Sequence, residues 1–277
     1  MVNTYRIITK ELYDLLGDRF LLFIGCFYVL IILIQVMNIN NDINNYHLQD
    51  VAPLFSSGLG GIINYYGVIL AIIIGYASIA SERRDNALNI LLTKPVYRDS
   101  IINGKMVGSL VYLFCLYLFG SLIFVAFSFI LCEDIFSGVF IQFVSMIVPI
   151  TIASLACAMV FYSLSLLLAI IFRGSGLSLI LVVFFWVFGQ MVSDVSISGN
   201  ISYIIESMGI ASSSEVGYFI MGIMPYGILS NFFAILTSRA DYSSLSMVLD
   251  INIMKLAVYA LILLIVSHIT FLRSDIS

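Results

Sequence analysis

The residues best suited to chemistry or to partner binding gather in one charged stretch between two long apolar runs. This stretch, loop 81–105, contains five cations and three carboxylates. Within it, residues 84–93 predict a short helix with leucines on one side, and Pro95 ends that helix because proline restricts the residues before it. A short amphipathic helix in a stiff, polar loop is typical of a docking surface, so we predict that loop 81–105 binds a protein partner.

The candidate contact residues are charged, lie on the leucine face, or shape the backbone. They are Glu82, Arg83, Arg84, Asn86, Leu88, Leu91, Leu92, Pro95, Arg98 and Lys105. The alternative is ordinary charge retention, because short cytoplasmic loops of any membrane protein are rich in Lys and Arg. The combination of an amphipathic helix, a stop and a Gly104-Lys105 entry into the next apolar run favours docking.

No catalytic arrangement accompanies this loop. The sequence lacks a nucleotide-binding glycine loop, a His-Glu-x-x-His pair and a Gly-x-Ser-x-Gly turn. His47 and His268 are far apart, and the four cysteines show no paired metal spacing. We therefore expect no catalysis, no cofactor and no metal in this chain.

The composition of the chain indicates which kind of element positions the loop. The chain of 277 residues is 61% hydrophobic and 10% charged, with a mean hydropathy of +1.10. A helix needs about 20 apolar residues to cross a bilayer core of about 30 Å. Six windows meet this need, which predicts an all-α, polytopic membrane protein: 20–37, 62–80, 106–131, 140–172, 177–193 and 256–271.

Charge is nearly absent from these windows. His268, close to the end of the last one, is the only side chain there that could titrate near neutrality. Ion-coupled carriers usually place ionisable groups at mid-membrane depth, so the pattern disfavours such a carrier.

Lys and Arg predict the orientation. With the N-terminus inside, Arg239 and Lys255 are external and the other ten of the twelve cations are cytoplasmic. Because cations stay on the cytoplasmic side, we expect a single multi-pass domain, residues 1–277, in the cytoplasmic membrane with both termini in the cytoplasm.

Residues 216–236 form a further uncharged apolar run, and a seventh span would give eleven cytoplasmic cations against one external, so charge bias alone cannot decide between six and seven spans. Pro225 in its middle and three glycines favour short interfacial or re-entrant helices instead. We expect the segment 194–250 to be external and to fold over the outer face.

The N-terminal residues 1–19 predict an amphipathic elbow helix. Ile8, Leu12, Leu15 and Leu16 recur at spacings of three and four, so one face can lie in the inner membrane interface. A solvated N-terminal arm is the alternative. The charges before the first span argue against a cleavable signal peptide.

Loop 81–105 resembles the signature of permeases of type-two ATP-binding-cassette (ABC) exporters. The resemblance rests on Glu82, Leu88, Leu91-Leu92, Pro95-Val96, Arg98, Ile102 and Gly104-Lys105. Asn86-Ala87 stands where that family has Gly-Thr. The ending Phe271-Leu272-Arg273-Ser274-Asp275-Ile276 is similar to the family's Phe-x-Arg-Arg-Asp-Ile ending, without its second Arg.

This resemblance implies a function and partners. Loop 81–105 would be a coupling helix in a groove of a cassette ATPase subunit that binds ATP and Mg, and the tight turn at Arg173 and Gly174 would be a second, minor contact. For that turn a plain helical hairpin is an equal alternative. The family also implies six spans, short external helices before the last one, and a second permease copy or paralogue.

The substrate pathway is the least determined feature. Asn64, Tyr76 and Gln190 are polar residues on the second and fifth spans, which in the resembled family face the dimer interface. An uncharged lining suits amphipathic molecules. An ATP-independent carrier or channel remains the alternative function, and the net charge of −4 with no basic face argues against nucleic acid as a partner.

Overall fold

The computed structural model of the protein describes residues 2–17, 19–46, 52–84, 98–172, 176–193, 222–237 and 242–273. This part of the chain is helical almost throughout and contains no strand. Its helices are α1 (Val2–Gly17), α2 (Arg19–Tyr46), α3 (Ala52–Arg84), α5 (Arg98–Leu131), α6 (Glu133–Ile171), α7 (Gly176–Ser193), α10 (Pro225–Thr237) and α11 (Tyr242–Arg273). The prediction of an all-α chain is confirmed for these residues.

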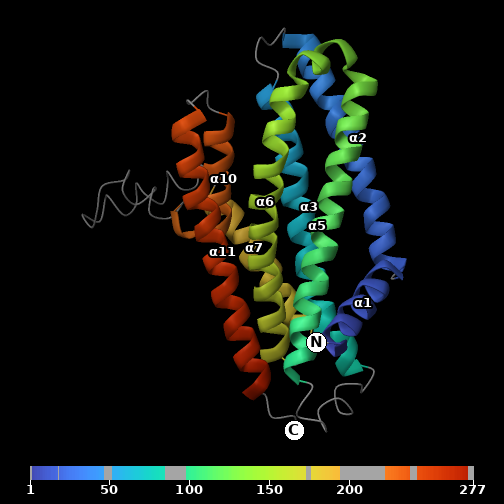
Figure 1. The fold of residues 1–277 in the computed structure, drawn as a ribbon, viewed down its shortest axis with the longest axis vertical. Coiled ribbons are helices and arrows are strands. Elements are labelled where there is room, and N and C mark those ends of the chain that lie inside the picture. Colours follow the sequence, from blue (N-terminus) through green and yellow to red (C-terminus); the bar gives the residue numbers. More distant parts are fainter. Residues whose placement is uncertain are drawn as a thin grey trace, which may run out of the picture.

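The long helices stand side by side in an elongated bundle (Figure 1). α3 runs toward the end of the bundle at which α1 lies, and α5 runs back from it. We call this end, which holds the end of α3 and the start of α5, the loop end. α11 also finishes there, so α1 and the last described helix share one end of the bundle (Figure 1).

Five of the described helices are long and apolar enough to cross a membrane. Their spanning segments are Phe23–Ile43, Ser57–Ala80, Asn103–Leu131, Phe143–Ile171 and Ile251–Phe271. They coincide with five of the six predicted windows, which confirms a polytopic membrane protein. The remaining window corresponds to α7, a shorter apolar helix, so the sixth span stays a prediction.

α6 is the central helix of the bundle. It packs most extensively against α3 and α11, and Ala153, Cys157, Tyr162 and Leu166 along it are fully buried. Its 39 residues continue through Pro149, which gives a length of about 58 Å at 1.5 Å per residue. This length exceeds the bilayer core, as the long fourth window predicted.

α10 is a short helix packed inside the bundle. Its 13 residues reach only about 20 Å, too short to cross a membrane alone. Ile228, Leu229 and Phe232 are buried, and the helix contacts α3, α6, α7 and α11. The described part of the 216–236 run is therefore a half-length helix that begins at Pro225, where the sequence predicted a break.

Candidate functional site

The two ends of loop 81–105 are helical, and its middle lies outside the described residues. α3 extends to Arg84 and α5 begins at Arg98. Glu82, Arg83, Arg84 and Arg98 belong to these helix ends, with side chains outside the described part. Asn86, Leu88, Leu91, Leu92, Pro95, Arg173 and Gly174 are also outside it. The docking hypothesis for them stays a prediction.

Lys105, the last residue of the loop, is held by a carboxylate from the N-terminal helix. Its Nζ donates to Oε2 of Glu11 at 3.0 Å and to Oε1 at 3.3 Å. Only 8% of the Lys105 side chain and 14% of the Glu11 side chain are exposed. The structure therefore places Lys105 beneath the loop, where its ammonium faces α1 and is not part of an exposed docking surface.

A glycine allows α1 to approach α5 this closely. A Cβ at Gly108 would lie 3.2 Å from both Cβ and Cγ of Glu11 and 3.7 Å from the carbonyl oxygen of Ile8. α1 is thus seated on the first turns of α5, with Leu15 buried, while Leu16 is exposed. The predicted N-terminal helix is present, although Leu16 is not on its packed face, and its place at the membrane interface stays a prediction.

A layer of polar groups continues from this ion pair into the bundle. Ser109 Oγ donates to the Lys105 carbonyl at 2.9 Å. The fully buried Tyr162 of α6 carries its hydroxyl beside Ser78, Ser109 and the Glu11–Lys105 pair, without a hydrogen bond of ordinary geometry. Four helices, α1, α3, α5 and α6, therefore meet in one polar layer directly beneath loop 81–105.

α3, which leads into the loop, is also closely joined to α6. Ser165 Oγ donates across the interface to the Ile72 carbonyl at 2.7 Å. A Cβ at Gly75 would lie 2.6 Å from the Tyr162 carbonyl oxygen, so only glycine fits there without a shift. α3 and α6 are therefore in direct contact at this level of the bundle.

The predicted pathway residues lie on α3 and α7, and their role in a pathway stays a prediction. Asn64 is buried, with its Oδ1 lacking a hydrogen-bond partner. Gln190 is half-buried and its Nε2 also lacks one, while Tyr76 is half-buried. None of the three lines either of the two cavities described below.

A cavity of about 400 Å³ instead opens between α2, α3 and α7. Gln35, Ser57, Tyr65, Tyr66 and Trp186 supply its polar and aromatic lining, and none of its described lining residues is charged. In the sequence, Tyr65 and Tyr66 suit an interfacial aromatic belt at least as well as a pathway lining, and Gln35, Ser57 and Trp186 were missed. The available signal was the uncharged polar and aromatic character of these residues, which lie in or near the predicted windows 20–37, 62–80 and 177–193.

Tyr226 of α10 contacts Tyr65, one of the residues that line this cavity. Its hydroxyl donates to the Tyr65 hydroxyl at 2.9 Å, and the two rings are 6.2 Å apart. Burial, followed by the hydrogen bond to Tyr65, raises the pKa of Tyr226 well above its usual value. The Tyr226 hydroxyl therefore keeps its proton and can donate a hydrogen bond to Tyr65.

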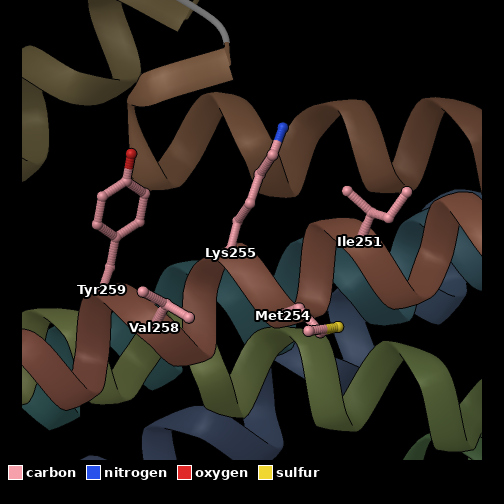
Figure 2. Close-up of a pocket in the computed structure, with 5 residues that line it drawn as sticks. All are labelled: Ile251, Met254, Lys255, Val258 and Tyr259. Carbon is pink, nitrogen blue, oxygen red and sulfur yellow. The ribbon is translucent and has the colours of Figure 1, made fainter.

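A second cavity of about 400 Å³ lies along α11. Figure 2 shows Lys255 and Tyr259 pointing to the same side of the helix, with Ile251, Met254 and Val258 beside them. Lys255 is exposed and lies within the spanning segment Ile251–Phe271, one residue before the predicted window 256–271. Among the described residues, no group of three His, Cys, Asp or Glu side chains could hold a metal ion.

Comparison with known proteins gives one match over nearly the whole chain. The sequence model of the family described as ABC-2 family transporter protein matches residues 5–276. No curated protein matches the chain.

Proposed function

The chain belongs to the ABC-2 family of transporter proteins, and from this premise we propose that it is the permease subunit of an ATP-driven exporter. Permeases of this family are membrane subunits without catalytic activity of their own, and they normally work with a cassette ATPase. The observation that carries the proposal is the family match over residues 5–276. Five apolar helices of spanning length agree with it.

In the proposed mechanism, a separate cassette subunit binds ATP and Mg and docks on loop 81–105. Closure of two cassettes displaces the loop and, with it, the ends of α3 and α5. Because Ser165 and Gly75 join α3 tightly to α6, the central helix follows that displacement. Arg173 and Gly174, between α6 and α7, provide a second contact in this proposal.

The proposed transporter contains a second permease copy or a paralogue. Five or six spans are too few to enclose a wide pathway, and α7 exposes Phe184, Phe185 and Phe188. The uncharged cavity lining of Gln35, Tyr65 and Trp186 favours an amphipathic, uncharged substrate. Such a molecule loses little hydration free energy when it enters a site without charges.

Purification from the native membrane tests this function. The tagged chain is solubilised in mild detergent, co-purifying proteins are identified by mass spectrometry, and vanadate-sensitive ATP hydrolysis is measured. We expect a stoichiometric cassette ATPase. A chain that purifies intact but alone and inactive from several mild detergents would contradict the proposal and favour an ATP-independent carrier or channel.

Charge reversal in the loop gives a sharper test. We expect Glu82→Lys or Arg98→Glu to abolish transport-coupled ATP hydrolysis while membrane insertion stays normal, because both changes alter the proposed docking surface. Asp42→Lys, at an exposed position near the opposite end of the bundle, is the matched control. Normal coupling in both loop variants would refute the docking role of loop 81–105.

A further inference from the structure

The Glu11–Lys105 pair is a costly way to hold two helices together. Both side chains are at least 86% removed from solvent, and transfer of two charges out of water carries a penalty that their attraction often only balances. Apolar residues of similar size frequently give equal or greater stability at such positions. Fold stability alone therefore gives little reason for an ion pair here.

The pair joins two elements that are distant in sequence. Glu11 and Lys105 are 94 positions apart, and α1 packs far more extensively on α5 than on α2, the helix that follows it directly in the chain. The bond lies within the first turns of α5, immediately after the proposed coupling loop. α1 is thus attached to the base of that loop.

The attachment also leads toward the substrate cavity. α1 ends at Gly17 and α2 begins at Arg19, so a displacement of α1 is passed to α2 through the chain. α2 contributes Ile31 and Gln35 to the uncharged cavity. A continuous route therefore connects the loop, α5, the Glu11–Lys105 bond, α1, α2 and the cavity wall.

We propose that Glu11 is a positioning residue for coupling: by holding Lys105, it makes α1 move with α5 and so transmits displacement of loop 81–105 to α2. This inference rests on the proposed function. The ion pair suits this role because separation of two helices joined by a buried pair would leave an uncompensated charge on each. The absence of a side chain at Gly108 brings Glu11 of α1 close to the backbone of α5.

The test measures α1 directly in the assembled transporter. A spin label is placed at Tyr13→Cys, a position 75% exposed on α1, in a chain whose native cysteines are replaced by serine or alanine. The complex with its cassette ATPase is reconstituted in lipid nanodiscs, and the electron paramagnetic resonance spectrum is compared without nucleotide and after ATP–vanadate trapping. We expect a clear nucleotide-dependent change in the parent protein.

Three variants isolate the ion pair. Glu11→Gln should reduce the nucleotide-dependent change by about fivefold or more, and the charge swap Glu11→Lys with Lys105→Glu should restore it. Asp14→Asn is the matched control, because Asp14 is an exposed carboxylate on the same helix, and it should behave like the parent. Thermal unfolding and basal ATP hydrolysis of each complex are measured alongside.

A fourth variant covers the case in which the charge swap does not fold. The double variant Glu11→Met with Lys105→Met retains side-chain volume without charge, so it should fold. Because flexible thioethers make no directional bond, the nucleotide-dependent spectral change of the label on α1 should be lost. The inference would be overturned if the nucleotide-dependent spectral change in Glu11→Gln or in the double-methionine variant were as large as in the parent protein. Absence of ATP hydrolysis in the parent complex would instead refute the proposed function.

Discussion

At the scale of single residues, Gly75 is the position at which the α3–α6 interface has least room. A methyl group there would lie 2.6 Å from the Tyr162 carbonyl oxygen and 2.9 Å from Ser165 Cβ. Because the first neighbour is backbone, Gly75→Ala must push the helices apart. We expect a loss of about 1–3 kcal/mol in unfolding free energy, measured as a lower thermal midpoint in detergent.

Gly25→Ala is the matched control for Gly75. Gly25 lies on a spanning helix, as Gly75 does, but a Cβ there would meet nothing within 4 Å. Alanine should therefore be neutral at this site or stabilise the helix slightly. Equal midpoints for the two alanine variants would show that α3 and α6 are not in the close contact described.

The ion pair illustrates what a single sequence can and cannot predict about residues. Lys105 stands out in the sequence as the end of a charged loop, whereas no local pattern indicates Glu11 as its partner. Their pairing depends on the approach of α1 to α5 at Gly108. Local patterns carry no information on such a tertiary contact. Lys105 was therefore predicted to contact a partner protein, whereas in the structure it contacts Glu11.

At the scale of elements, two serines on α6 allow a hydrogen bond between helices to be compared with a hydrogen bond within one helix. Ser165 Oγ donates to the Ile72 carbonyl of α3 at 2.7 Å, whereas Ser163 Oγ donates to the Val160 carbonyl of its own helix at 2.8 Å. We expect Ser165→Ala to destabilise the protein by about 0.6 kcal/mol and Ser163→Ala to have a smaller effect. Denaturant unfolding of the two variants, compared with the parent, measures the difference.

A larger loss in Ser163→Ala than in Ser165→Ala would contradict this account of the α3–α6 interface. Both variants remove one buried hydroxyl of the same size from the same helix, so the small cavity that each leaves is matched. The interhelical bond is the remaining difference between them.

The predicted spans match the helices in their middles and differ at their ends. The first window ended at residue 37, but α2 continues to Tyr46, and the last window began at residue 256, but α11 begins at Tyr242. Hydropathy identifies the apolar part because about 20 such residues are needed to cross the bilayer. A helix continues past that part since its backbone hydrogen bonds do not require apolar side chains.

For the whole molecule, the arrangement of helix ends and the distribution of cations make a joint prediction about sidedness. α1 and the end of α11 lie at the loop end, and α2 finishes at the opposite end (Figure 1). The excess of Lys and Arg on loop 81–105 and near both termini predicts that the loop end lies in the cytoplasm. The same placement is required if a cytoplasmic ATPase docks on the loop.

Cysteine labelling tests this sidedness in cells. Single cysteines replace Lys10 on α1, Arg273 on α11 or Asp42 on α2, which are all exposed, in a chain without its native cysteines. We expect a membrane-impermeant maleimide to label Asp42→Cys in intact cells and to label Lys10→Cys and Arg273→Cys only after permeabilisation. The reverse pattern would show that the loop end faces the outside, where no cytoplasmic ATPase could reach loop 81–105. Labelling of Lys10→Cys and Arg273→Cys from different sides would contradict the bundle itself, because both helix ends lie at its loop end.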